Sequence, residues 1–186
     1  MGVLNVTPDS FSDGGLFLDS GKAIGRALEM VRQGADLIDV GGESTRPGAE
    51  AVPPDEELRR VLPVVKELAS QRFAVSIDTS KASVAAACIE AGALIVNDVT
   101  ALRDPDMARV CAEAGCTVCL MHMKGDPSTM QSAPSYSNVV TEVRDALLAW
   151  AGSAQTQGVE RRNLWLDPGI GFGKSVAHNL TLINHL

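Results

Sequence analysis

The chain has 186 residues, of which 45% are hydrophobic, and its 16 Lys and Arg against 23 Asp and Glu give a formal net charge of −7. This composition is typical of one globular domain with a sizeable core, and it excludes a disordered or fibrous chain. A net negative charge disfavours binding to nucleic acid or to anionic membranes, so we expect neither as a partner. The sequence shows no run of about 18 apolar residues and no secretory signal at its start.

Short apolar runs alternate with amphipathic stretches along the whole chain. The runs predict buried parallel strands, and the stretches between them predict helices that often end before a glycine. In chain order, the expected strands cover residues 3–6, 37–40, 74–77, 94–96, 117–121 and 164–166. The expected helices cover residues 23–33, 56–69, 83–91, 105–114 and 139–157, and a further helix begins at 176.

This alternation predicts an α/β fold, either an open doubly wound sheet or a closed (β/α)8 barrel. Polar residues follow nearly every expected strand, and a ring of such groups is what the mouth of a barrel requires. The groups are Asn5, the segment 41–46, Asp78, Asn97, His122 and Asp167. We therefore predict that residues 1–186 form one TIM-type barrel domain with about six strand–helix units, its C-terminal strands missing, since a barrel has eight.

The four cysteines include a C-x-x-C spacing, Cys116 and Cys119, which could indicate a zinc or redox site. The surrounding CTVCLM reads as a strand, however, and residues three apart in a strand point to opposite faces. We expect structural thiols in a reducing cytoplasm.

The first strand runs into NVTPDSFSDGG, residues 5–15, which could be only a solvated turn. The amide oxygen of Asn5 at the strand end suits Mg²⁺, which prefers oxygen ligands and usually keeps waters while it binds substrate phosphates. Phe11 is apolar in an otherwise polar loop and could cover a ligand.

The second strand runs into DVGGESTRPGA, residues 39–49. Gly41 and Gly42 would let the backbone approach a ligand closely. Thr45 and Arg46 can donate hydrogen bonds to phosphate oxygens, and Pro47 would help to turn the loop back toward the next helix. The alternative is a plain strand-to-helix loop with a surface arginine.

Three further polar residues, Asp78, Asn97 and Asp167, end later strands. A lone Asp there is usually a helix or loop cap. Two Asp and an Asn that face one mouth would instead form a polar pocket, because buried carboxylates need donors. One carboxylate, for which we choose Asp167, could accept an amino group and a ring N–H side by side.

Two motifs near the end of the chain remain open to more than one interpretation. GFGKS resembles the end of a P-loop, but the required first glycine is Pro168, so nucleotide hydrolysis is not expected. His122 could be a general base or a structural histidine, and a lone histidine is more often structural.

Taken together, NVTPDSFSDGG, DVGGESTRPGA, SIDTSK, IVND, CLMHM and LDPGIGFGK resemble the motifs of the dihydropteroate synthase family, in the family's order and over essentially the whole chain. The resemblance implies a (β/α)8 barrel and a transferase of folate biosynthesis. Such enzymes condense 6-hydroxymethyl-7,8-dihydropterin pyrophosphate with p-aminobenzoate to form 7,8-dihydropteroate and pyrophosphate, and they are sulfonamide targets.

The resemblance also implies roles for single residues. Asn5 would bind Mg²⁺, Thr45 the pyrophosphate, and Asp78, Asn97 and Asp167 the pterin. Arg46, Phe11 and Pro47 would belong to loops that close over pyrophosphate and form the aminobenzoate site, with Phe172 and Met121 near the ligands. Chemically, Thr45 and Arg46 would stabilise the departing pyrophosphate and Asp78 a cationic pterin, so no protein nucleophile is needed.

The family's Ser-Arg-Lys segment on the seventh strand and Arg-x-His segment on the eighth have no counterpart here, so we expect the isolated chain to be inactive or a weak pterin binder. The nearest rival is a pterin-binding methyltransferase domain, which would not need the two phosphate loops. The resemblance further implies a possible homodimer.

Overall fold

The computed structural model describes residues 1–7, 16–44, 51–125, 129–130 and 134–185, and the side chains of 16–19 are not described. Strands and helices alternate through these ranges. In chain order they are β1 (Gly2–Asn5), α1 (Leu16–Arg32), β2 (Leu37–Gly41), α2 (Pro54–Ser70), β3 (Ala74–Asp78), α3 (Ala82–Glu90), β4 (Ile95–Asp98), α4 (Met107–Ala114), β5 (Thr117–Met121), α5 (Val139–Thr156), the 3-10 turn η2 (Arg161–Asn163), β6 (Leu164–Asp167) and α6 (Val176–Ile183).

The chain forms two compact units. The described residues of the first lie within Met1–Ser44 and Glu50–Asn97, and those of the second lie within Asp98–Leu186. In the first unit β1, β2, β3 and β4 pair in parallel and in chain order. In the second, β5 pairs in parallel with β6. Parallel neighbours joined through helices are the arrangement that the alternating sequence predicts.

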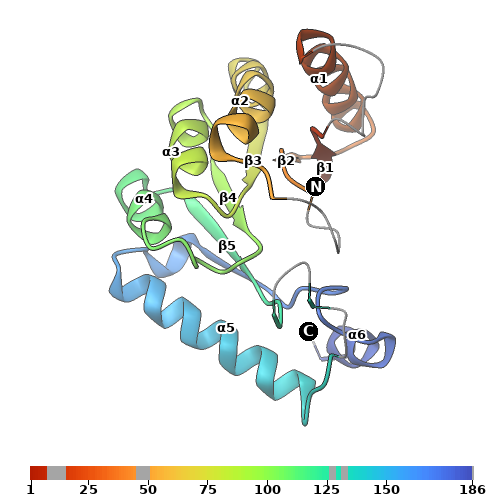
Figure 1. Ribbon diagram of the computed structural model, residues 1–186, viewed down its shortest axis with the longest axis vertical. Helices are drawn as coiled ribbons and strands as arrows, with labels where there is room; N and C mark the ends of the chain where they lie inside the picture. The colour runs from red at the N-terminus through yellow and green to blue at the C-terminus, as the bar shows by residue number, and fades with distance from the viewer. Residues whose placement is uncertain (8–15, 45–50, 126–128, 131–133, 186) are drawn as a thin grey trace. The chain divides into compact units, whose positions relative to one another are not determined.

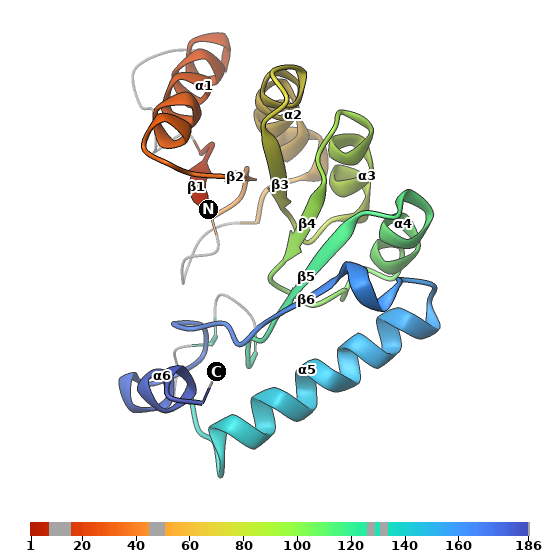
Figure 2. The ribbon, with the colours of Figure 1, turned by 180° about the vertical axis from the view of Figure 1, so that it is seen from behind.

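The core of the first unit lies between the strands and α1, α2 and α3, which follow one another along the same face of β1–β4 (Figures 1 and 2). Alternate strand residues point toward the helices, as the two-residue period of a strand dictates. The fully buried side chains there include Ile38, Val40, Val75, Ile77 and Val96 from the strands and Val61, Val64, Val65 and Leu68 from α2.

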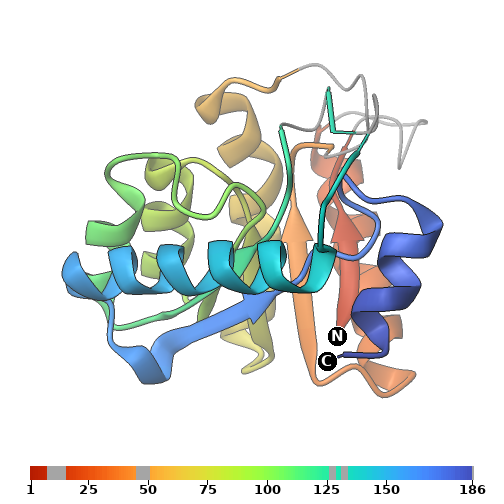
Figure 3. The same ribbon diagram turned by 90° about the horizontal axis from the view of Figure 1, so that it is seen from below.

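In the second unit, α6 packs against the N-terminal half of α5 (Figure 3). Val139, Val143 and Leu147 on α5 form a buried cluster with Leu182 on α6. Side chains cap both helix starts: Asn138 accepts the Thr141 N–H before α5, and Ser175 forms a capping box with His178 before α6.

The predicted helix ends are confirmed where glycine follows a helix. Gly115 adopts a left-handed conformation, φ 63°, directly after α4, and its N–H donates to the carbonyl of Ala112. A residue without Cβ adopts this conformation at little cost, which explains why α4 ends there. Among the described residues, no helix has the length and apolar composition to cross a membrane.

Candidate functional site

One row of residues crosses the carboxyl ends of the four strands in the first unit. Asn5 on β1 pairs with Gly41 on β2, Gly41 pairs with Asp78 on β3, and Asp78 pairs with Asn97 on β4. Residues in register across parallel strands point to the same face of the sheet. The row therefore brings together three of the polar residues that the sequence predicts for the site.

Gly41 leaves space between its two neighbours in the row. A Cβ at this position would lie 3.3 Å from Oδ2 of Asp78 and 3.6 Å from Oδ1 of Asn5. The carboxylate and the amide oxygen thus face the same gap. Oxygen donors that converge in this way suit a hard divalent cation or the N–H groups of a polar ligand.

Asp39 lies one layer below the row and was not chosen as a site residue from the sequence. Its side chain is 3% exposed, and its Oδ2 accepts the Asn97 amide at 3.0 Å. Burial raises the pKa of this carboxyl, against the opposing effect of hydrogen bonds from Ser76 and Asn97. The other oxygen, Oδ1, is buried and has no hydrogen-bond partner among the described residues, so it can accept from a ligand.

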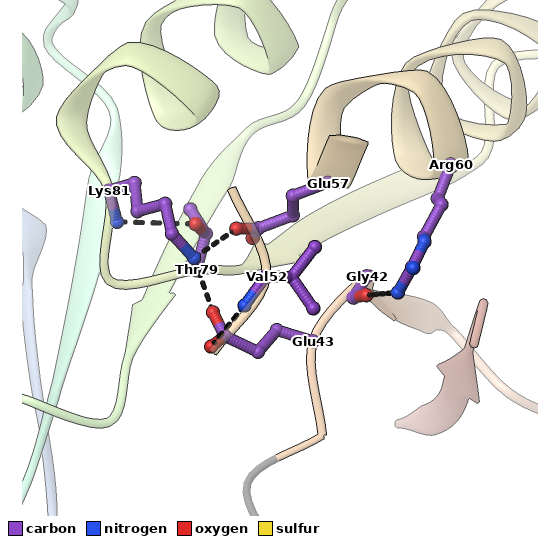
Figure 4. A network of polar contacts seen from close by, with 7 residues as sticks. All are labelled: Gly42, Glu43, Val52, Glu57, Arg60, Thr79 and Lys81. Carbon is purple, nitrogen blue, oxygen red and sulfur yellow. Dashed lines mark hydrogen bonds and ion pairs between the residues drawn. The ribbon is translucent and has the colours of Figure 1, made fainter. Parts of the chain in front are cut away.

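A polar network holds the two ends of the segment that follows β2 (Figure 4). Glu43 accepts the Val52 N–H at 3.1 Å and also pairs with the Lys81 ammonium. Lys81 pairs in addition with Glu57 on α2 at 2.5 Å. One ammonium therefore links the end of β2, helix α2 and the loop after β3.

Opposite charges within this network offset the cost of removing its charged groups from water. The Glu57 side chain is fully buried and Lys81 is 20% exposed. Burial lowers the pKa of Lys81, but hydrogen bonds and charge attraction from Glu43 and Glu57 outweigh that effect and raise the pKa above 10.5. Arg60 adds a bond from its Nη1 to the Gly42 carbonyl at 2.9 Å.

In the second unit, Met121 on β5 is in register with Asp167 on β6. The His122 N–H donates to the Asp167 carbonyl at 2.8 Å, and Asp167 Oδ1 accepts the Gly169 N–H at 2.7 Å. Asp167 thus caps the loop that follows β6, which is the common structural role of an Asp at a strand end. Its half-buried carboxylate has a second oxygen for a ligand.

Phe172 lies on the same loop and packs against an apolar cluster of Val99, Met121, Met123 and Met130. The predicted site residues Met121, Asp167 and Phe172 therefore come together within the second unit. The three methionines of this cluster are each at most 6% exposed, so they belong to the core against which the half-buried Phe172 ring packs.

His122 is buried, and its ring stacks on Trp150 with centroids 5.7 Å apart. Burial, assisted by the nearby Lys174 charge, lowers the pKa of His122 from 6.5 to about 4. The ring is therefore neutral near pH 7. These contacts fit the structural interpretation of His122, which the sequence left open.

Lys174, the lysine of GFGKS, is 3% exposed and its Nζ lies within 3.1 Å of three backbone carbonyls and of His122 Nδ1. Burial lowers its pKa from 10.5 to about 8, although the Asp167 carboxylate acts in the opposite direction. Because the ammonium faces protein carbonyls, it is not placed as a phosphate-binding P-loop lysine.

The remaining predictions divide into those that the structure describes and those that it does not. No disulfide joins any of the four cysteines, all of which lie in described ranges. Among the described residues, no group of three or more His, Cys, Asp or Glu could hold a metal ion. Four predicted site residues lie outside the described residues: Phe11, Thr45, Arg46 and Pro47.

A mainly apolar hollow of about 230 Å³ lies between α5, α6 and β6. Val143, Leu147, Leu166 and Leu182 are among its lining residues, and none of the predicted site residues lines it. Its polar lining residues are Arg144 and His185, and because none of the strand-end residues reaches it, we do not assign the site to it.

Comparison with known proteins identifies the class of protein to which this chain belongs. The family model described as pterin binding enzyme matches residues 1–186, the whole chain. Within that class, the chain belongs to the dihydropteroate synthase family, as the sequence motifs predicted. The dihydropteroate synthase of Haemophilus influenzae is 45% identical over 188 residues, which cover 100% of this chain and 68% of the relative.

Other relatives give the same result. The dihydropteroate synthase of Mycobacterium leprae is 52% identical and that of Escherichia coli 49%, each over 100% of this chain. The chain spans 66% of each of these two relatives and 22% of a probable bifunctional folylpolyglutamate synthase/dihydropteroate synthase from Haloferax volcanii. The chain therefore corresponds to about two thirds of a single-function relative.

Solved structures confirm the predicted fold class. The dihydropteroate synthase of Xanthomonas albilineans with 4-aminobenzoic acid has a TM-score of 0.92 and 48% identity, over 100% of this chain and 66% of that one. The Yersinia pestis enzyme with a sulfonamide drug also has a TM-score of 0.92 and 48% identity, over 68% of that chain. The fold is α/β and of the TIM-barrel type.

Proposed function

We propose that this chain supplies the pterin-binding side of a dihydropteroate synthase site. The reaction joins 6-hydroxymethyl-7,8-dihydropterin pyrophosphate to p-aminobenzoate and releases pyrophosphate. The observation that carries the proposal is the row of Asn5, Asp78 and Asn97 around Gly41. Relatives of the same family have been solved with 4-aminobenzoic acid and with 7,8-dihydropteroate.

The pterin is proposed to bind through acceptors and donors that complement its edge. Its amino group and ring N–H would donate to Asp167, while Asp78 and Asn97 address other ring nitrogens. Oδ1 of Asp39, which is buried and has no hydrogen-bond partner among the residues that the structure describes, supports this assignment because a ligand N–H could donate to it. By the resemblance, Met121 and Phe172 would contact the flat ring.

The pyrophosphate is proposed to be held by groups that follow β1 and β2. Thr45 and Arg46 would donate to its oxygens. Asn5 fits Mg²⁺ as a neutral oxygen ligand, since this ion takes most of its ligands from phosphate and water. When bound, Mg²⁺ would supply positive charge that stabilises the departing pyrophosphate.

In the proposed mechanism, the bond between the exocyclic carbon of the pterin and the pyrophosphate oxygen breaks, and the electron pair leaves with pyrophosphate. Asp78, which faces the gap at Gly41, would stabilise the positive charge that remains on the pterin. The amino nitrogen of p-aminobenzoate then forms the new bond and loses a proton. Phe11, Pro47 and Arg46 are proposed to contribute to the p-aminobenzoate site.

The proposal also includes the cytoplasm as the location of the protein and a homodimer as its assembly. Both follow from the resemblance.

A hybrid protein provides the test. We would replace the matching 66% of the Escherichia coli dihydropteroate synthase with this chain and express the hybrid in a strain that lacks its own enzyme. We expect growth without folate end products, and we expect a sulfonamide to inhibit that growth. Failure of a stably expressed hybrid to form dihydropteroate would contradict the proposal, and activity indifferent to sulfonamides would count against the p-aminobenzoate site.

Two carboxylate variants and a matched control sharpen this test. Asp78→Ala and Asp167→Ala should each abolish complementation, and calorimetry should show loss of pterin binding. Asp36→Ala should leave both unchanged, because Asp36 is exposed and precedes β2, at the opposite end of the strand from Gly41. Wild-type pterin affinity in Asp167→Ala would contradict its assignment.

A further inference from the structure

The loop between β6 and α6 is held in place by one buried ammonium. Lys174 Nζ donates to the carbonyls of Phe172 at 2.8 Å, Gly169 at 2.9 Å and His122 at 3.1 Å. It also lies 3.1 Å from Nδ1 of His122. An ammonium has three hydrogens, so the three carbonyls alone can use its full donor capacity.

The loop lies unusually close to the end of β5. Gly169 has φ +65°, and a Cβ on it would lie 2.0 Å from the His122 carbonyl oxygen. A Cβ on Gly173 would lie 3.0 Å from the carbonyl oxygen of Lys124. Glycines allow this approach but leave the free loop with many conformations, so an additional contact must select one.

The three carbonyls that Lys174 holds are adjacent to the pterin contacts of the second unit. His122 directly follows Met121 in the chain, and Gly169 donates its N–H to Asp167. Phe172 is itself a proposed contact, and it packs against the buried cluster that includes Met121. One ammonium thus fixes the relative positions of an aromatic ring, a thioether and a carboxylate that come from two strands and one loop.

We propose that Lys174 is a positioning residue, which sets Met121, Asp167 and Phe172 in the arrangement that receives the pterin ring. This inference rests on the proposed function, because the pterin contacts are assigned there. Lys174 touches no substrate in this scheme. It acts through the backbone of the loop, so its removal should disturb pterin binding without removing any pterin ligand.

The test compares Lys174→Met with Lys174→Gln and with a nearby control, Lys124→Met. Methionine keeps an unbranched apolar chain that ends one atom short of the lysine Nζ and removes every donor, and glutamine keeps an amide that can donate twice. Lys124 is exposed and bonds the Ser135 carbonyl, outside the loop. In the active hybrid, we expect Lys174→Met to raise KM for the pterin pyrophosphate about 10- to 100-fold, by analogy with residues that orient metal ligands through hydrogen bonds, whose loss costs a similar factor.

Two further results distinguish positioning from a general loss of structure. Fewer folded molecules would lower the apparent kcat for both substrates and leave KM unchanged. We expect instead an intermediate KM for Lys174→Gln and a wild-type KM for Lys124→Met. In the chain itself, the Phe172 and Gly169 amides should exchange hydrogen at least tenfold faster in Lys174→Met, while the α5 amides keep their rates.

The outcomes separate this inference from the proposed function. An active hybrid in which Lys174→Met retains the wild-type KM overturns the inference and leaves the function intact. Unchanged exchange of the loop amides also overturns the inference. A hybrid that folds but makes no dihydropteroate overturns the function, and the inference with it.

Discussion

Each unit removes a lysine from water, Lys81 partly and Lys174 almost completely, and the two lysines have opposite surroundings. Lys81, in the first unit, pairs with the carboxylates of Glu43 and Glu57, and its pKa is raised. Lys174, in the second, faces carbonyl groups and a neutral imidazole, and its pKa is lowered to about 8. Opposite charges offset the cost of removing an ammonium from water, whereas carbonyl dipoles offset only part of it. The surroundings of Lys81 therefore favour its charged form, whereas those of Lys174 disfavour it.

The substitution that should destabilise the chain most removes the cation from the ion network of the first unit. Lys81→Met leaves the fully buried carboxylate of Glu57 without its cation, and loss of one partner of a buried pair costs roughly 3–5 kcal/mol. We expect a decrease of that size in the free energy of unfolding, measured by urea denaturation. Lys66→Met, an exposed lysine on α2, should change it by less than about 0.5 kcal/mol.

A double variant sharpens this comparison. Adding Glu57→Gln to Lys81→Met removes the uncompensated charge and should recover part of the lost stability. If Lys81→Met alone is as stable as the Lys66→Met control, the network is not an ion pair of structural importance and the contrast between the two lysines fails.

The next effect is a pH dependence with opposite signs for the two lysines. Because the pKa of Lys174 falls from 10.5 to about 8 on folding, the unfolded chain binds more protons between these values and stability rises with pH. The gain attributable to Lys174 should approach about 3 kcal/mol at pH 10.5. The pKa of Lys81 is raised, so its contribution to the free energy of unfolding is constant in this range and decreases only at higher pH.

Urea denaturation between pH 7.5 and 10.5 measures this effect. The pH profile of Lys174→Met should lack the rise seen in the wild-type chain, and the difference between the two profiles isolates Lys174 from the other titrating groups. Parallel profiles would show that the Lys174 ammonium keeps its ordinary pKa.

The smallest expected effect concerns the loop that Lys174 holds. Gly169→Ala should lower the free energy of unfolding by at least about 2 kcal/mol, because a left-handed Ala costs about 1–2 kcal/mol and its Cβ would also meet the His122 carbonyl. Gly171 has φ +88° with open space around it, so Gly171→Ala should show the backbone cost alone, about 1 kcal/mol. Equal losses in thermal or urea unfolding would contradict the close approach of the loop to β5.

The sequence predicts most of the fold because its periodicities are local. All six predicted strands and the helices that follow them are present, with bounds that shift by a few residues. The largest error is the start of α1, which lies at Leu16 and not at 23. Gly21 precedes the predicted start, and a glycine weakens a helical pattern, but the helix continues through it.

The site is less predictable because part of it depends on contacts between distant residues. The polar residues at the strand ends, Asn5, Asp78 and Asn97, could be found because strand direction alone sends them to one edge. Asp39 could have been found as a charged residue inside an apolar run. The pairing of Lys81 with Glu43, 38 residues away, has no local signal.

The row Asn5–Gly41–Asp78–Asn97 draws one residue from each of four strands, and its successive members are separated in the chain by the length of a helix and its loops. Deletion of a single residue within β1, β3 or β4 would shift the strand's end by one position and turn its polar side chain to the other face of the sheet, and deletion within β2 would move Gly41 out of the row. Insertions and deletions should therefore be tolerated very unevenly: readily at the helix-to-strand turns on the opposite side of the sheet, and hardly at all within the strands.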